Sequence, residues 1–350
     1  MKNIFVINLC LTTFFLASCQ SEKYENTSLF FFKDFKISIK PDVTNFEFDE
    51  PLMKPLLFVK SDSLLIVQNI KTNKMLYIYN VNTRKKVGDF IWWGNGPNDL
   101  LRIKNLQLIE SDLYITDSQQ KSINKYDVND IHQLTDNLVP IQKITIDDLF
   151  THIAYTENGF VATTMNPKDK RLVFYNLKGD KIATIGEYPY YGKELTMREK
   201  IEGFISQIAI CHQYKRIYLF GTSVDLIEIY DFQGILIKRL HGPEQLFPQL
   251  KEIRTTEGYS VIESLEKPKY AFFSPQIVND EIYVSYSGQH LNMNEESPRI
   301  NHILVFDLDC NPVRRYELSK SIVSFIVDPD TKLIYATCDE PDFHMVVFEP

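Results

Sequence analysis

Apolar and polar residues alternate along most of this chain in short runs that are typical of β-strands. Residues 74–99 show the pattern most clearly, because an apolar, aromatic-rich run at 75–79 is followed by a polar turn and a second run at 87–93. The sequence Gly94-Asn95-Gly96-Pro97 then predicts a sharp corner, since glycine tolerates positive φ and proline fixes its own φ. Variants of this unit recur down the chain, which indicates a repeat fold.

The best marker of the repeat is an apolar strand that ends in an aromatic residue followed by a polar one. The intervals between successive markers are 47, 49, 55, 76 and 42 residues, close to the roughly 40 to 50 residues of a propeller blade apart from one long insertion. Six markers predict six blades. They are Tyr79-Asn80, Tyr126-Asp127, Tyr175-Asn176, Tyr230-Asp231, Phe306-Asp307 and Phe348-Glu349.

Four strands can be placed in each of the first five units and three in the last, at which point the chain ends. An isolated alternating stretch at residues 35–39 would supply the missing strand and close the ring, leaving no exposed sheet edge there. The sequence therefore predicts an all-β fold, a six-bladed β-propeller of four-stranded antiparallel blades closed by the N-terminal strand. The units span residues 56–93, 103–146, 152–185, 205–240, 271–318 and 323–348.

Three long insertions, at residues 187–204, 241–270 and 287–301, join second to third strands or one blade to the next. Successive strands of a blade run in opposite directions, so we expect these insertions on one face and the insertion at 128–140 on the other. Short helices are predicted at 193–202 and 243–253, the second interrupted by Pro248.

Residues 1–18 have the layout of a signal peptide, with Lys2 before an apolar run that is too short to span a bilayer. The sequence Leu16-Ala17-Ser18-Cys19 resembles a bacterial lipobox, which implies that Cys19 carries lipid and anchors the chain to a membrane. Gln20 favours the outer membrane, with the periplasmic or surface side left open. The alternative is an ordinary secretory signal with an incidental cysteine. Residues 19–33 are interpreted as a tether and 34–350 as the propeller.

The full chain has a net charge of −8, which becomes −9 without residues 1–18, because Lys2 is their only charge. An acidic chain without clustered Lys or Arg argues against nucleic acid as a partner. Beyond Cys10 and Cys19, the three remaining cysteines, Cys211, Cys310 and Cys338, are widely spaced and fit neither a disulfide framework nor a zinc site. We expect them to be buried, and we expect no metal and no cofactor.

Residues 34–350 resemble the six-bladed β-propeller lipoproteins of gut Gram-negative bacteria, often described as TolB-like or NHL-like. The resemblance rests on the lipobox, the number of blades and a Gly-x-Gly-Pro-x-acid corner formed by Gly94, Gly96, Pro97 and Asp99. The family's usual Gly-Glu after the proline is Asn98-Asp99 here. The resemblance implies the fold; propellers serve unrelated functions.

The predicted insertion face is rich in tyrosine, tryptophan and arginine, which supply large contact area and directional donors at binding sites. It could hold a glycan or an envelope protein, or its side chains could pack only on one another. The candidate ligand-binding residues are Trp93, Arg102, Tyr191, Arg198, Arg254, Tyr270, His290 and Arg299.

An enzyme is the alternative. No Gly-x-Ser-x-Gly elbow occurs, and the seven histidines are scattered. Propeller hydrolases, lactonases and lyases assemble their residues at the channel mouth from different blades, where Asn69, Asp117 and Glu228 are candidates, although solvent-facing strand positions explain them equally. A scaffold without a small ligand is the third possibility. We expect a membrane-anchored binding protein with no assigned catalytic residue.

Overall fold

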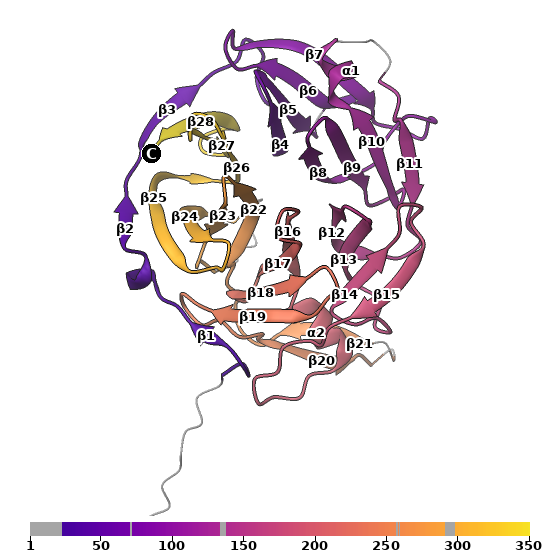
Figure 1. Ribbon diagram of the computed structural model, residues 1–350, viewed down its shortest axis with the longest axis vertical. Helices are drawn as coiled ribbons and strands as arrows, with labels where there is room; N and C mark the ends of the chain where they lie inside the picture. The colour runs from indigo at the N-terminus through magenta and orange to yellow at the C-terminus, as the bar shows by residue number, and fades with distance from the viewer. Residues whose placement is uncertain (1–22, 71, 134–137, 257, 259, 291–297) are drawn as a thin grey trace, which may run out of the picture.

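The computed structural model describes residues 23–70, 72–133, 138–256, 258, 260–290 and 298–350. Its strands form six antiparallel blades around a central channel (Figure 1). Each blade has four strands from the channel outward, in sequence order in the first five blades, whereas the outermost strand of the sixth comes from the N-terminal part of the chain. No helix in these ranges is long and apolar enough to cross a membrane. The blades are, in order, β4 (Pro55–Ser61), β5 (Leu64–Asn69), β6 (Lys74–Asn80) and β7 (Lys85–Trp92); β8 (Ile103–Ile109), β9 (Asp112–Asp117), β10 (Ser122–Asp127) and β11 (Gln142–Thr145); β12 (Phe150–Thr156), β13 (Gly159–Thr164), β14 (Leu172–Tyr175) and β15 (Lys181–Ile185); β16 (Ser206–Cys211), β17 (Arg216–Gly221), β18 (Leu226–Asp231) and β19 (Leu236–His241); β22 (Phe272–Val278), β23 (Glu281–Tyr286), β24 (Ile300–Asp307) and β25 (Pro312–Ile322); and β26 (Ser324–Val327), β27 (Ile334–Cys338), β28 (His344–Glu349) and β3 (Asp42–Phe46).

The six-bladed prediction is confirmed, and the repeat strands lie where the sequence places them. Their ends agree with the expected ones to within two residues, except that β25 runs four residues further. The three expected buried cysteines are free and buried.

The prediction that an N-terminal strand closes the ring is confirmed, but residues 35–39 are not that strand. The closing strand is β3, which pairs antiparallel with β28 in the sixth blade. The side chain of Phe46 explains this choice, because it packs among residues of blades six and one and so seals the seam between them. In contrast, Ile37 is 52% exposed, and β2 (Ile37–Ile39) pairs parallel with β25 as a fifth, outer strand of the fifth blade.

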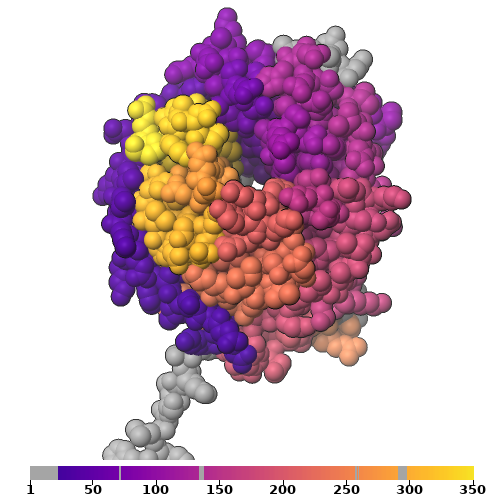
Figure 2. Space-filling model, in the orientation of Figure 1, coloured from indigo at the N-terminus to yellow at the C-terminus, as the bar shows by residue number. Residues whose placement is uncertain are grey.

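Residues 24–46 form an N-terminal strap along the outside of the ring, seen in indigo beside the orange and yellow blades in Figure 2. Its β1 (Ser28–Leu29) pairs parallel with β19, and η1 (Phe32–Asp34) leads to β2. Tyr24 and Phe30 are buried. The described part of the predicted tether is therefore packed on the folded body.

The polar residue of each repeat marker caps the turn from the third strand to the fourth. In the first five blades its side-chain oxygen accepts backbone N–H groups two to four residues later, at 2.8–3.0 Å. Short Asn and Asp side chains suit this geometry, which explains why the marker recurs. These caps are Asn80, Asp127, Asn176, Asp231 and Asp307.

Polar side chains also cross each of the six seams between neighbouring blades. Because backbone groups and charges buried there need partners, the pairs fix each blade to the next. In order round the ring they are Gln68 with Ile103 O, Asn105 with Ile153 O, Arg171 with Glu228, Gln207 with Ser274 N, Gln276 with Phe325 O and Val327 N, and Lys60 with Asp328.

The insertions contain the remaining elements. Helix α1 (Val128–His132) follows β10, and α2 (Met197–Gly203) begins at a capping box in which Thr196 and Glu199 each accept the other's backbone N–H. The first predicted helix is thus present. The second is wrong, because residues 243–249 form no helix and residues 250–254 are β20 (Leu250–Arg254), which forms a hairpin with β21 (Ser260–Ser264).

Candidate functional site

The insertions gather on one face of the ring, as their strand connections predict. Arg198 of α2 donates to Ser260 O at 2.5 Å, and its guanidinium lies 3.7 Å from the Glu252 carboxylate on the β20–β21 hairpin. The third insertion joins them, since Nδ1 of His290 lies 2.9 Å from Lys267 O. Segments far apart in the sequence are therefore held together.

These segments enclose a hollow of about 710 Å³, which we call the insertion groove. It lies between α2, residues 245–250, β21 and residues 266–270, with His290 at one side. Its walls combine apolar side chains such as Phe247 and Val261 with planar polar ones such as Gln249. Three candidate residues, Arg198, Tyr270 and His290, line it.

Tyr270 is the aromatic candidate of this groove. It is half-buried, and its ring packs edge-on against Phe273 at 5.5 Å between centroids. Burial raises the pKa of its hydroxyl, so this group remains protonated and can donate a hydrogen bond at neutral pH. The ring and hydroxyl together offer one apolar face and one polar tip.

Three other candidates do not reach the groove. Tyr191 is 2% exposed and packs under the insertions with Tyr24 and Phe247, so it supports the face from below. Arg254 lies at the end of β20, and its Nε donates to Gly258 O at 3.4 Å. The guanidinium of Arg299 pairs with Glu340 at 2.6 Å.

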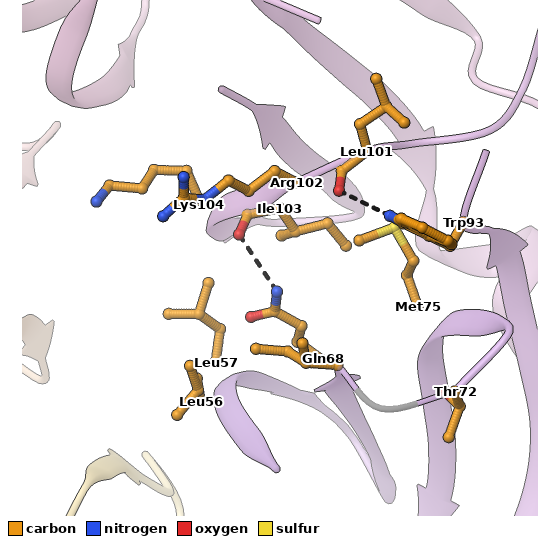
Figure 3. Close-up of a pocket in the computed structure, with 11 residues that line it drawn as sticks. Leu56, Leu57, Gln68, Thr72, Met75, Trp93, Leu101, Arg102, Ile103 and Lys104 are labelled. Carbon is orange, nitrogen blue, oxygen red and sulfur yellow. Dashed lines mark hydrogen bonds between the residues drawn. The ribbon is translucent and has the colours of Figure 1, made fainter. Parts of the chain in front are cut away.

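The remaining two candidates line a second hollow of about 430 Å³ on the same face, between blades one and two (Figure 3). We call it the mouth pocket, because Leu57 and Lys104 line both it and the central channel. Trp93 is 65% exposed, and its Nε1 donates to Leu101 O at 3.2 Å, which fixes the indole. Arg102 and Lys104 extend to the side of the pocket away from this ring.

The Gly-rich corner positions Trp93 beside the mouth pocket. The Asp99 carboxylate folds back over the turn and accepts the N–H of Gly96 at 2.8 Å, while the N–H of Gly94 donates to Leu100 O at 3.1 Å. A Cβ at Gly94 or Gly96 would lie 2.6 Å from Asp99 Oδ2, so a larger residue at either position would displace this carboxylate from the turn. Pro97 occupies the turn between them and Asp99.

The channel itself contains a hollow of about 670 Å³ lined by the innermost strand of every blade. Two lysines line it, and Lys60 is paired with Asp328 at 2.5 Å. Burial and the charge of Lys104 lower the pKa of His152 to about 3, so its imidazole is neutral at physiological pH.

The three residues considered for catalysis serve local structure. Asp117 accepts backbone N–H groups of Leu101, Gln119 and Gln120. Asn69 accepts the N–H of Met53, and Glu228 is held between two arginines. Within the described ranges, no three His, Cys, Asp or Glu side chains are grouped as metal ligands would be.

The sequence interpretation did not include Lys104. The signal that could have found it is its spacing, because Arg102 and Lys104 lie two residues apart at the start of a first strand and so share one side of it. Cys19 lies outside the described residues.

A family model described as TolB-like 6-blade propeller-like matches residues 33–330. Among solved structures, a DUF4221 family member from Bacteroides vulgatus has a TM-score of 0.55 at 10% identity, covering 89% of this chain and 96% of that chain. A protein from Bacteroides fragilis described as exported also has a TM-score of 0.55, at 12% identity, with 89% and 98% covered. The RRP9 WD40 repeats reach 0.50 at 8% identity, with 89% and 99% covered. No curated protein matches the sequence.

At these identities the solved structures support the fold alone, whereas the family model spans most of the chain. The match over residues 33–330, the ring of six four-stranded blades and the corner at residues 94–99 agree, and this chain belongs to the TolB-like six-bladed propeller family.

Proposed function

We propose that this chain is an exported lipoprotein, anchored in the outer membrane through Cys19, that binds a glycan in the insertion groove. The observation that carries the proposal is the groove, which three separate insertions build together on one face. Its volume of about 710 Å³ lies within the range of concave small-ligand sites. A protein partner would instead favour a flatter and larger surface.

The side chains of the groove suit a sugar. Tyr270 supplies an aromatic platform, while Arg198, Gln249 and His290 supply planar hydrogen-bonding groups around it. Glu202 adds a carboxylate acceptor. Sugar rings present hydroxyl groups at their edges and C–H groups on their faces, so a mixed lining of this kind complements both.

The proposed anchor places this groove near the membrane. The lipobox-like sequence ends at Cys19, and Tyr24, five residues later, is buried against Phe247 of the groove wall. Five extended residues span at most about 18 Å. An acylated Cys19 therefore holds the insertion face close to the bilayer, where envelope glycans begin.

The test is a thermal-shift and calorimetric screen of residues 20–350, which retain all of the described fold, against envelope oligosaccharides. A glycan at about 100 times its dissociation constant stabilises the fold by about 2.7 kcal/mol. Tyr270→Ala should weaken binding about tenfold, which corresponds to about 1.4 kcal/mol. Tyr214→Ala is the matched control, because this tyrosine is 51% exposed on a first-to-second-strand turn of the opposite face.

If a glycan binds Tyr270→Ala and the unsubstituted chain with equal affinity, the insertion groove is not its binding site. The absence of a shift with every glycan would contradict the glycan proposal. Crosslinking in intact envelopes would then test the envelope-protein alternative.

A further inference from the structure

The mouth pocket and the channel differ in charge from the rest of the molecule. The chain carries 46 acidic residues against 38 Lys and Arg. Among the described residues that line these two hollows, none is Asp or Glu, and the titratable ones are Lys60, Arg102, Lys104 and His152. A positive interior in an acidic protein attracts anions and excludes cations.

Two of these cations lack a counter-ion. Asp328 neutralises Lys60. Neither the Arg102 side chain nor the Lys104 side chain has a hydrogen bond or ion pair with any residue in the part of the chain that the structure describes. Figure 3 shows the two side chains extending to the same side of the pocket, and burial, together with the charge of Arg102, lowers the pKa of Lys104. An anion bound between them would relieve this repulsion.

The opposite side of the pocket is apolar and preorganised. Leu56 and Leu57 form its floor, and Met75 lies beside the Trp93 ring, which forms a wall. The hydrogen bond from Gln68 to Ile103 O fixes β8 relative to the first blade, so the pocket need not rearrange on binding.

The backbone that leads to Trp93 is strained. Ile91 is β-branched and has a φ of +60°, an unfavourable combination that proteins keep mainly at functional sites. After it, Trp92 stacks under the Lys74 ammonium at 3.9 Å, whereas Trp93 turns to the mouth pocket.

We propose that the mouth pocket binds a small organic carboxylate, with its carboxylate between Arg102 and Lys104 and its body on Trp93 and the leucine floor. The site is separate from the insertion groove and does not depend on the glycan proposal. The flat apolar lining favours a planar apolar body over a sugar.

Intrinsic fluorescence reports directly on this site, because Trp92 and Trp93 are the chain's two tryptophans. In the mature lipoprotein purified in detergent, Trp92→Phe leaves Trp93 as the single indole fluorophore. Titration with phenylacetate should change its emission and saturate. Phenylacetamide, which has the same shape without charge, should bind at least tenfold more weakly.

Charge-removing variants locate the carboxylate. In the Trp92→Phe background, Lys104→Gln and Arg102→Gln should each weaken phenylacetate binding about tenfold and leave phenylacetamide unchanged. Lys251→Gln, which removes an exposed charge from the β20–β21 hairpin, should have no effect. Because neither side chain has a partner among the described residues that its removal would leave unpaired, neither variant should lower the melting temperature.

Two further probes test which anionic group the pocket binds and whether the rest of the ligand is apolar. Saturation by inorganic phosphate with phenylacetate affinity would overturn the carboxylate assignment. If glucuronate binds, loses its binding in the same variants, and phenylacetate does not bind, the ligand has the proposed carboxylate. The proposed apolar body would then be wrong. No saturable change with any carboxylate, or unchanged affinity in Lys104→Gln, would overturn the proposal.

Discussion

Phe46→Ala should destabilise the protein far more than Ile37→Ala, although both residues lie on N-terminal strands. Phe46 is 9% exposed, and its ring contacts Phe48 and Tyr335 with centroids 5.2 and 5.6 Å apart. The Arg84 guanidinium lies 4.7 Å from the same ring. Removal of such a ring leaves a cavity at the seam between the last blade and the first.

Buried Phe→Ala changes cost about 3–5 kcal/mol, and the slight exposure of Phe46 places it near 3 kcal/mol. Ile37, at 52% exposed on the outer strand β2, should cost about 0.5 kcal/mol. For a chain of this length the entropy of unfolding is roughly 0.7 kcal/mol/K, so the Phe46 change lowers the melting temperature by about 4 °C.

Urea unfolding followed by circular dichroism measures both free energies, with Phe46→Leu as a control that removes less of the side chain than alanine does and should lose about 1 kcal/mol. The reasoning assigns ring closure to β3 and an outer, supplementary role to β2. Equal losses for the two alanine variants, or a larger loss for Ile37→Ala, would refute that assignment.

Three further changes test other parts of the structure. Glu228→Gln should cost about 3–5 kcal/mol at pH 7, because it leaves two buried arginines without their carboxylate. Burial acts to raise the pKa of Glu228, but both guanidiniums outweigh it and lower that pKa, so the difference from wild type in urea unfolding should shrink as pH falls below about 4. Gly96→Ala should cost about 1–2 kcal/mol in the same assay, because its Cβ would displace the Asp99 carboxylate that caps the corner; an unchanged stability would mean that the corner relaxes freely. Cys19→Ala should release the protein from membranes in a high-salt wash, and continued partitioning would contradict the lipid anchor.

The blades could be predicted because their signals are local. A capped turn after each third strand uses Asn or Asp at one fixed position, so the marker at Asn80 or Asp307 can be recognised without knowledge of distant residues. The closing strand could not be chosen in this way. Residues 37–39 and 42–46 can both form strands. They are distinguished by the pocket that receives Phe46, which lies between the first and last blades, neighbours in the ring that are far apart in the sequence.

The sequence predicts on which face of the ring the insertions lie, but it does not predict which candidate side chains contact one another there. Strand direction alone brings the insertions together, but burial of Tyr191 depends on Tyr24 from the strap, and the pairing of Arg299 depends on Glu340. The segment at 250–254 became a strand because residues 260–264 offered it a hairpin partner, and this pairing overrode the predicted helix.

Lys60 and Lys104 occupy similar places in the ring but differ in whether a carboxylate of the chain pairs with them. Both line the channel, and both could serve as seam clamps in a fold that uses one polar pair at every seam. The chain supplies Asp328 for Lys60. For Lys104 it supplies a second cation, Arg102, and a fixed indole instead. Since the same channel neutralises one lysine internally, the charge of the other is better explained by a ligand than by a general shortage of carboxylates around the ring.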